Sequence, residues 1–358
     1  MVKPTHPPAN AFVAVVRKVY NPLGFGKGYN FVLFFIFFGA MMGFTLASFK
    51  SISFKVFCGE DSAAAPGECY YYRQNREKIG IILHLGAILP ASFLACFQFV
   101  PAIRHKALIV HRVNGYAVVL LSLIGTGSVF MFVRNAFGGG IDTQAGVGVL
   151  AIMFIGSMLL AYINVKRLQI EQHRAWMLRA WFYAGSIITL RLVQIIATMV
   201  ISTIGTYYAV RPCAQVADMV EDANRTLELY PECASFFSGA NPGQQAVVHA
   251  NLNDPSSAAE AGAALGLTFG MALWFSLALH AIGVELYLRL TPAESERLRN
   301  VSYKRQLEAG MKCPGRAGIT ADRIGDSDKW QPSCGGQERP QVVHKGSHDS
   351  SALQLPTP

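Results

Sequence analysis

Six long apolar blocks constrain this chain more than any other feature of its sequence. They cover roughly residues 31–49, 79–103, 113–133, 145–165, 177–204 and 263–290, and each is about as long as a helix that crosses a hydrocarbon core. Their apolar character runs all the way round, unlike that of a soluble amphipathic helix. With 15% charged residues, the chain also has too few charges to cover a soluble surface. We therefore predict an all-α membrane protein in the lipid bilayer, with a bundle of six transmembrane helices over 31–290.

The distribution of Lys and Arg between these blocks predicts the orientation, because cytosolic segments are enriched in both. The N-terminal segment 1–30 has four basic residues and no acid, and the short loop 104–112 has Arg104, Lys106 and Arg112. The long loop 205–262 has two basic and seven acidic residues, whereas the loop 50–78 departs from the pattern with five basic residues. We predict that both termini are cytosolic and that 50–78 and 205–262 are outer loops. The first block then acts as an uncleaved signal-anchor.

Cysteines and a sequon support this orientation. Two of the seven cysteines, Cys58 and Cys69, fall in the first outer loop, and Cys213 and Cys233 fall in the long acidic loop. Disulfides persist in oxidising compartments, so pairing within each loop is the simplest prediction, although four cysteines allow three connectivities. The sequon that begins at Asn224 predicts a glycosylated loop. These features indicate a secretory-pathway endomembrane or the plasma membrane.

The tail 291–358 differs from the rest of the chain. It contains ten basic and eight acidic residues without sustained apolar periodicity, which predicts a disordered cytosolic extension. Its residues Cys313, Cys334, His344 and His348 lack the paired spacing of a structural zinc site, so we predict no zinc there.

Ionisable residues inside the spans are the natural candidates for function, since they are expensive at membrane depth. Arg191 falls near the middle of the fifth block, too deep to reach either surface. We expect it to meet an acid, backbone carbonyls or an anionic ligand. His84, toward the outer side, and the deeper His280 complete a set of three candidate catalytic residues. The alternative is that these histidines only serve close helix packing.

A second set of candidates lies at the cytosolic helix ends. His111 and His173 share a depth on different helices, as bis-imidazole ligation of haem iron requires. Arg112, Arg174 and Arg179 could then pair with the haem propionates. The alternative is that His-Arg pairs simply anchor helices at the membrane interface.

Three elements of the sequence resemble the polytopic membrane proteins of domain-of-unknown-function family 2306, which occur in bacteria and, with long outer loops, in filamentous fungi. The elements are His84 to Gln98-Phe99, then His111-Arg112-Val113-Asn114-Gly115-Tyr116, then His173-Arg174-Ala175-Trp176-Met177 with Thr189-Leu190-Arg191. The resemblance covers about residues 80–200 and implies a multi-pass protein without a particular reaction. A looser similarity to six-helix b-type cytochromes of the b561 and ferric-reductase kind implies haem b.

Three functions fit these observations. The first is a transmembrane redox protein that holds haem b between His111 and His173. The second is an enzyme or carrier for a lipophilic anionic small molecule, with Arg191 on the acid group and His84 or His280 in proton transfer. The third is a non-catalytic scaffold or sensor. Nucleotide-binding, serine hydrolase and zincin motifs are missing from the sequence, which argues against those enzyme classes, and no motif supports nucleic-acid binding.

Overall fold

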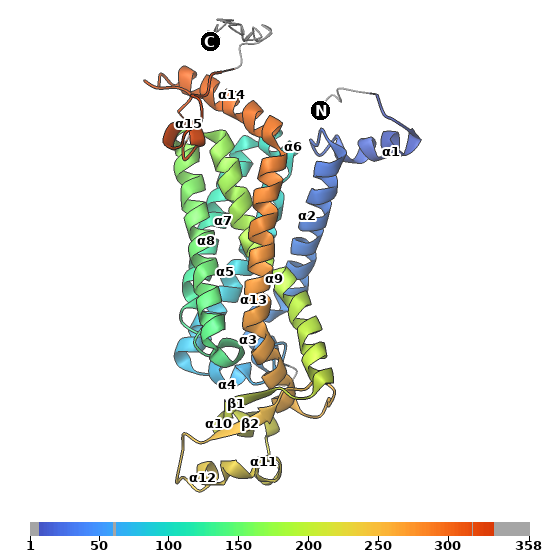
Figure 1. The fold of residues 1–358 in the computed structure, drawn as a ribbon, viewed down its shortest axis with the longest axis vertical. Coiled ribbons are helices and arrows are strands. Elements are labelled where there is room, and N and C mark those ends of the chain that lie inside the picture. Colours follow the sequence, from blue (N-terminus) through green and yellow to red (C-terminus); the bar gives the residue numbers. More distant parts are fainter. Residues whose placement is uncertain (1–6, 60–61, 317, 333–358) are drawn as a thin grey trace, which may run out of the picture.

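The computed structural model describes residues 7–59, 62–316 and 318–332 (Figure 1). Six of its helices are long and apolar enough to cross a membrane, which confirms the six predicted spans. They are α2 (Gly28–Ser48), α5 (Asn75–Gln98), α7 (Leu108–Val129), α8 (Ile141–Lys166), α9 (Ile170–Ile204) and α13 (Ala258–Leu290).

The helices extend beyond the apolar blocks because local signals set their ends. Ser257 caps α13, and its side chain accepts a hydrogen bond from the Glu260 N–H, so the helix begins at Ala258 rather than near 263. Gly205, with φ 72°, ends α9 in the left-handed conformation typical of a helix C-terminus. The second span stops at Gln98 instead of 103, because Pro101 starts the separate helix α6 (Pro101–Lys106).

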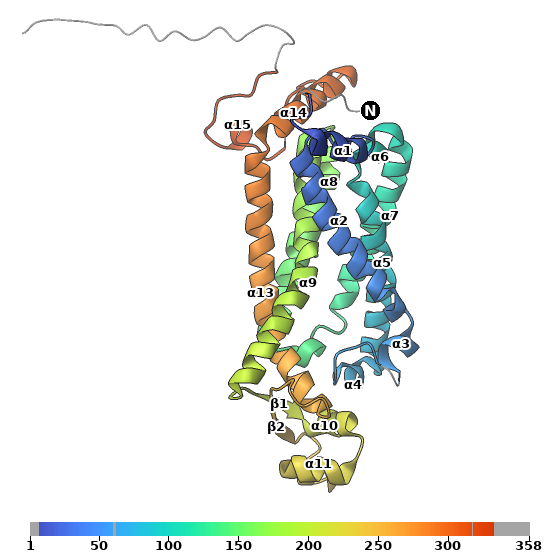
Figure 2. The same cartoon turned by 90° about the vertical axis from the view of Figure 1, so that its right-hand side faces the viewer.

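The six long helices form two groups. One group is the pair α5 and α7, and the other is α9 with α8 and α13 packed against it. Helix α2 contacts both α5 and α9, and Figure 2 shows it crossing the boundary between the groups. Buried side chains of α5, α7, α8 and α9 also meet at this boundary, where Phe154 and Trp181 pack edge to face. The boundary, termed here the seam, is therefore apolar in its interior.

Short elements cover the two ends of the bundle. The end termed here the terminal end carries α1 (Ala11–Tyr20), α6, α14 (Pro292–Glu308) and α15 (Ala321–Ile324) (Figure 1). The opposite end, termed the disulfide end, carries η1 (Phe49–Ile52), α3 (Phe54–Cys58), α4 (Glu68–Tyr72), η2 (Ala136–Gly139), β1 (Tyr208–Pro212), α10 (Cys213–Val220), α11 (Ala223–Leu229), η3 (Pro231–Cys233), α12 (Ala234–Phe237) and β2 (Gln245–His249).

The tail folds onto the terminal end through hydrogen bonds. Ser302 of α14 donates to the Glu171 carboxylate and accepts from the Ile170 N–H at 2.8 Å. Gln306 Nε2 donates to the Arg167 carbonyl oxygen at 3.1 Å. The expectation of disorder from residue 291 is therefore wrong for residues 291–316 and 318–332, because polar contacts with α9 and with Arg167 order a segment that lacks an apolar stripe. Cys334, His344 and His348 lie outside the described residues.

Replacing Ser302 with Ala should loosen α14. The change leaves Glu171 with one hydrogen bond fewer, at a cost of about 1 kcal/mol, which corresponds to roughly fivefold more of the detached segment. Limited trypsin cleavage after Lys304 and Arg305 should accelerate accordingly. Ser295→Ala is the matched control, because the Ser295 hydroxyl donates to the Thr291 carbonyl oxygen one turn earlier instead of to α9. Equal cleavage rates in the two variants would show that Ser302 does not hold the tail.

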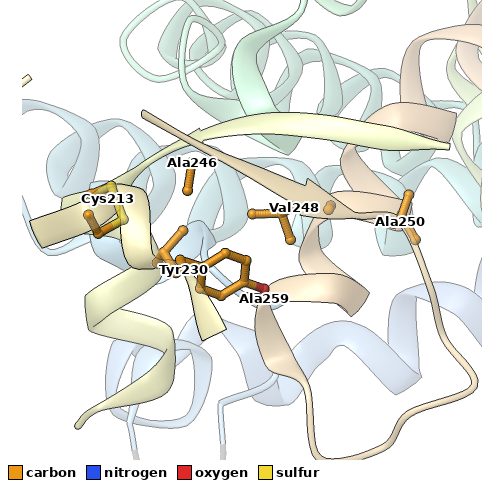
Figure 3. Packing of buried hydrophobic residues seen from close by; sticks show 10 residues of the cluster. Cys213, Tyr230, Ala246, Val248, Ala250 and Ala259 are labelled. Atoms are coloured by element: carbon orange, nitrogen blue, oxygen red, sulfur yellow. A yellow bond between two sulfur atoms is a disulfide. The ribbon is translucent and has the colours of Figure 1, made fainter. Parts of the chain in front are cut away.

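The disulfide end contains a two-stranded ribbon, so the all-α prediction is wrong for the loop 205–262. Strands β1 and β2 pair antiparallel, with Val210 opposite Val247. Alternation along β2 turns Ala246 and Val248 inward onto the Cys213–Cys233 disulfide and the start of α13 (Figure 3). Each strand has five residues, too few to form an apolar block of membrane length, so the sequence pattern gave no sign of the ribbon.

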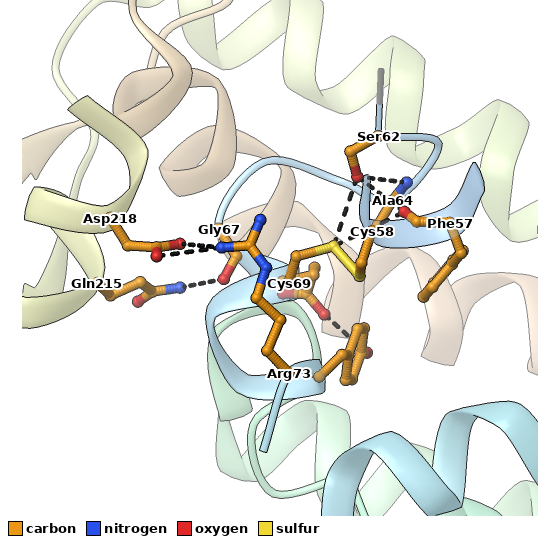
Figure 4. The surroundings of a disulfide bond; sticks show 11 residues. Phe57, Cys58, Ser62, Ala64, Gly67, Cys69, Arg73, Gln215 and Asp218 are labelled. Carbon is orange, nitrogen blue, oxygen red and sulfur yellow. Dashed lines mark hydrogen bonds and ion pairs between the residues drawn. A yellow bond between two sulfur atoms is a disulfide. The ribbon is translucent and has the colours of Figure 1, made fainter. Parts of the chain in front are cut away.

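Both disulfides join cysteines of the same loop. Cys58 is bonded to Cys69 and Cys213 to Cys233, the simplest of the three connectivities. The two disulfide-bonded segments are also linked to each other (Figure 4). Arg73 Nη1 lies 3.2 Å from Asp218 Oδ1, and Gln215 Nε2 donates to the Gly67 carbonyl oxygen at 3.0 Å. At the disulfide end, the two disulfide-bonded segments are thus joined into one lobe by an ion pair and a hydrogen bond.

Candidate functional site

Four basic or titratable side chains gather at the terminal end, two from the consecutive helices α6 and α7 and two from the start of α9. Arg104 belongs to α6 and His111 to the first turn of α7, while His173 and Arg174 belong to the start of α9. His111 is within electrostatic range of Arg104 and His173, and Arg104 is within range of Arg174. These four residues are termed the basic cluster. The structure thus brings the predicted pair His111 and His173 together and adds Arg104, which the sequence indicated only as a loop charge.

The two imidazoles of the basic cluster have different partners. His173 Nδ1 donates to the Ala161 carbonyl oxygen at 3.0 Å, which fixes the tautomer and leaves a lone pair on Nε2. His111 Nδ1 is buried and has no hydrogen-bond partner within the described part of the chain. Each ring therefore has a nitrogen free for a ligand or a proton.

Arg174 is held in place by α13 and α2. Its Nη2 lies 3.4 Å from the Tyr287 hydroxyl, and its guanidinium is 5.7 Å from the centre of the Tyr287 ring. The Tyr287 hydroxyl in turn donates to Asn30 Oδ1 at 3.3 Å. None of these partners is an acid, so the positive charge of Arg174 is oriented without being neutralised by them.

The other two arginines proposed for propionates are placed differently. Arg179 Nε and Nη2 lie 2.5 and 3.0 Å from the two oxygens of Glu285, and the guanidinium sits 4.5 Å from the centre of the Trp176 ring. This bidentate pair occupies Arg179. Arg112 is exposed at the start of α7, as Arg104 is on α6, and it is also within electrostatic range of His111, the residue that precedes it. Trp176 Nε1, one turn from His173, is buried without a hydrogen-bond partner in the described chain.

Glu294, at the start of α14, is an acid that interacts electrostatically with the basic cluster. It is within electrostatic range of both Arg104 and Arg174, and it forms two 2.7 Å hydrogen bonds with Arg297. Burial raises the pKa of Glu294, but the Arg297 hydrogen bonds and the arginine charges outweigh it and hold the pKa below its ordinary value. Glu294 is thus held as a carboxylate, and its negative charge partly offsets the positive charge of the basic cluster.

A second polar cluster, around Glu68, lies at the disulfide end. Glu68 is 5% exposed, and its carboxylate accepts hydrogen bonds from the Tyr72 hydroxyl and the Phe137 N–H, both at 2.9 Å. Burial raises the pKa of Glu68 to about 7, although these hydrogen bonds and the charges of Arg211 and Arg191 lower it. The disulfide end thus supplies a buried acid that the sequence did not single out.

Arg191 belongs to this second cluster. Its Nη1 donates to Gln194 Oε1 at 3.2 Å, and its guanidinium lies 4.9 Å from the centre of the Phe137 ring and 5.6 Å from that of Phe269. These two rings are stacked at 4.0 Å. Arg191 is also within electrostatic range of Glu68. Its surroundings, an amide, two aromatic faces and an acid, are those of a structural cation.

Arg211, in β1, is the second arginine within electrostatic range of Glu68. It is 8% exposed and lies so close to Gly138 and Gly266 that a Cβ at either position would collide with its guanidinium. Gly138 also has φ 82°, in the left-handed region. The glycines of η2 and α13 therefore make room for this buried arginine.

His84 and His280 hydrogen-bond to neighbouring helices rather than to members of either cluster, although the His84 ring packs on Phe132, which in turn packs on Tyr72. His84 Nδ1 donates to the Gly125 carbonyl oxygen at 2.7 Å, joining α5 to α7. His280 Nδ1 donates to the Phe182 carbonyl oxygen at 2.8 Å, so its Nε2 accepts from the Thr189 hydroxyl at 2.7 Å. Both nitrogens of His280 are therefore used in helix packing. A shared catalytic role of His84, His280 and Arg191 remains a prediction without support from their contacts.

The arrangement of possible metal ligands does not form a site with three or more of them in the described residues. Among residues 7–59, 62–316 and 318–332, no three His, Cys, Asp or Glu side chains are grouped to hold a metal ion. Bis-imidazole ligation needs only two ligands, so haem at His111 and His173 also stays a prediction.

Comparisons with known proteins agree with the resemblance in the sequence. Residues 81–220 match the family DUF2306, described as predicted membrane proteins. Over 252 residues the chain is 27% identical to Ava biosynthesis cluster protein G of Aspergillus versicolor, covering 62% of this chain and 72% of that protein. No solved structure matches. The predicted resemblance is confirmed, and the matched region contains the whole basic cluster but neither Glu68 nor Glu294.

Proposed function

From the premise that the chain is an integral multi-pass membrane protein of the DUF2306 kind, we propose that it binds a lipophilic anionic metabolite, as a membrane-embedded enzyme or carrier of a biosynthetic pathway. The acid group binds at the basic cluster. The name of the Aspergillus versicolor relative, a biosynthesis cluster protein, supports a metabolite as the ligand.

The observation that carries this proposal is the charge of the basic cluster. Arg104 and Arg174 are both within electrostatic range of the Glu294 carboxylate, which is already hydrogen-bonded to Arg297. The terminal end therefore retains unneutralised positive charge beside the seam, and a bound acid would compensate it. Charge-assisted hydrogen bonds from arginine are the strong ones in such sites.

The lipophilic part of the ligand follows from the surface next to the basic cluster. Ile109 and Val113, which flank His111 on α7, are 77% and 64% exposed. These side chains face lipid when α7 spans the membrane, so an amphiphile can reach the basic cluster from the bilayer. His173 Nε2 and His111 Nδ1 would then be the groups that exchange a proton with the ligand.

A direct test compares three probes of equal length: a pyrene-labelled long-chain carboxylic acid, its methyl ester and the corresponding alkylammonium. Each is titrated onto the purified protein in nanodiscs. The proposal predicts that the acid binds more tightly than the ester and the ammonium most weakly. Equal affinity for acid and ester would contradict it.

We also propose that the terminal end is cytosolic, as the Lys and Arg distribution predicts, in a secretory-pathway endomembrane or the plasma membrane. Asn224 is exposed on α11 at the disulfide end. Expression in a eukaryotic cell should give a glycosidase-sensitive mobility shift that Asn224→Gln abolishes. Accessibility of the N-terminus to protease from outside the cell or from the lumen would contradict this orientation.

A b-type haem between His111 and His173 is the second proposal. It is favoured by the His173 Nδ1 bond to a backbone carbonyl, since a metal-ligating imidazole usually donates its other ring N–H to such a group. The two histidines would hold the iron, Arg104 and Arg174 would face the propionates, and the haem would supply one-electron transfer. The purified protein should then show a reduced-minus-oxidised α-band that His173→Ala removes and His84→Ala leaves. Protein from haem-replete cells without that band would exclude this proposal.

A further inference from the structure

Helix α1 presents an apolar stripe that the other described residues leave uncovered. Asn10 caps the helix, and its side chain accepts from the Val13 N–H at 2.8 Å. Phe12, Val15 and Val19 follow at spacings of one and two turns, and their exposed fractions are 75%, 60% and 57%. Three large apolar side chains on a ten-residue helix are costly in water.

The position of α1 is fixed by its C-terminal end. Tyr20 is 5% exposed and its ring packs 5.7 Å from that of Phe31 in α2. Just beyond the helix, the Leu23 carbonyl oxygen accepts from the Ala102 N–H of α6 at 2.9 Å. Figures 1 and 2 both show α1 lying across the axis of α2, at the terminal end of the bundle. A helix in this place lies at the level of the lipid headgroups rather than in the hydrocarbon core.

The charges around α1 are all positive. Arg17 and Lys18 occupy its last turn, Lys27 precedes α2, and no acidic residue occurs in the first 59 residues of the chain. A basic amphipathic helix in the interface plane binds anionic lipid through both its apolar face and its cations.

We propose that α1 is an in-plane anchor that binds the anionic surface of the leaflet at the terminal end. Phe12, Val15 and Val19 enter the boundary between headgroups and acyl chains, and Lys18 and Lys27 contact acidic headgroups. The inference does not depend on the ligand of the basic cluster. It assigns to the N-terminal segment a lipid-binding surface that the six spans do not require.

The test places an environment-sensitive fluorophore on Val15→Cys, in a full-length background with Cys96→Ala, Cys313→Ser and Cys334→Ser. Ala14→Cys is the matched control, because position 14 lies on a different side of α1. Both proteins are reconstituted into phosphatidylcholine vesicles with and without phosphatidylserine. Lipids brominated near the headgroup should quench the label at position 15 several-fold more than at position 14, and phosphatidylserine should increase the difference.

A second variant examines the charges separately. Lys18→Gln with Lys27→Gln should remove the response to phosphatidylserine and leave the quenching in phosphatidylcholine. A label at position 15 that aqueous iodide quenches as strongly as at position 14 would overturn the proposal. A label shielded from both quenchers would also overturn it, since another protein surface would then cover α1. Equal quenching at position 15 with and without phosphatidylserine would overturn the assignment to anionic lipid.

Discussion

Replacing Arg174 with Gln should weaken binding of the pyrene-labelled acid roughly ten- to a hundredfold while leaving the weaker binding of its methyl ester unchanged. A hydrogen bond to a charged group contributes about 1.5–3 kcal/mol, and each 1.4 kcal/mol is about tenfold in affinity. Arg174 carries most of this effect because Tyr287 and Asn30 orient its guanidinium without supplying a counter-charge. Fluorescence titration in nanodiscs measures the change.

Three further variants control for indirect effects. Arg112→Gln removes an exposed arginine near the same end and should bind the acid normally. Tyr287→Phe removes the hydroxyl that orients Arg174 but keeps the guanidinium. It should therefore reduce the affinity for the acid less than Arg174→Gln does. Glu294→Gln should act in the opposite direction and tighten binding, because it removes the carboxylate that competes for Arg104 and Arg174. Equal effects of Arg112→Gln and Arg174→Gln would mean that binding responds only to overall charge.

Replacing Glu68 with Gln should abolish a pH dependence of stability that the wild type shows between about pH 5 and pH 8. The folded-state pKa of Glu68 is about 7 and its ordinary value is 4.5, so the folded protein binds the proton more tightly than the unfolded chain. The contribution is fully present below the unfolded pKa and is lost as pH rises through 7. At 1.36 kcal/mol per pKa unit, the wild type should lose about 2–3 kcal/mol over this range.

Equilibrium unfolding in mixed micelles, followed by tryptophan fluorescence, measures this difference. The amide introduced by Glu68→Gln would keep an oxygen for the Phe137 N–H, so the variant isolates the charge from the hydrogen bond. Glu228→Gln is the matched control, because Glu228 is an exposed acid that pairs with its neighbour Arg225. It should retain the wild-type pH dependence. A pH dependence that survives in Glu68→Gln would place its origin elsewhere.

The membrane part of the fold could be predicted because a span needs only length and apolar composition. Blocks of membrane length identify α2, α5, α7, α8, α9 and α13 whatever they pack against. The helix ends were less accurate. The polar first turns of α9 and α13 lie outside the apolar blocks, although Ser257 and Glu260 have the spacing of a capping box.

The tail and the ribbon could not be predicted in the same way because tertiary contacts stabilise them. Helix α14 is polar, and its order depends on Ser302 and Gln306 reaching α9 and the nearby Arg167 that precedes it. The strands β1 and β2 are short and depend on the Cys213–Cys233 lobe for a buried face. A local pattern carries no information about such partners.

The site was predicted in part. Equal depth on two helices correctly placed His111 and His173 at one end, since depth follows from helical rise. Arg191 was expected to meet an acid, backbone carbonyls or an anionic ligand. In the structure it donates to Gln194 and is within electrostatic range of Glu68, an acid from a distant loop. Arg104 and Glu294 lie on α6 and α14, whose packing brings them to the basic cluster, so sequence spacing could not reveal them.

Photochemical mapping tests the central claim most directly. A long-chain carboxylic acid with a diazirine beside the carboxylate is irradiated with the protein in nanodiscs, and the modified peptides are identified by mass spectrometry. Binding at the basic cluster predicts adducts within residues 101–112 and 170–177 that the unlabelled acid competes away and its methyl ester does not. Adducts around Glu68 and Arg191, or spread evenly over the lipid-facing helices, would contradict it.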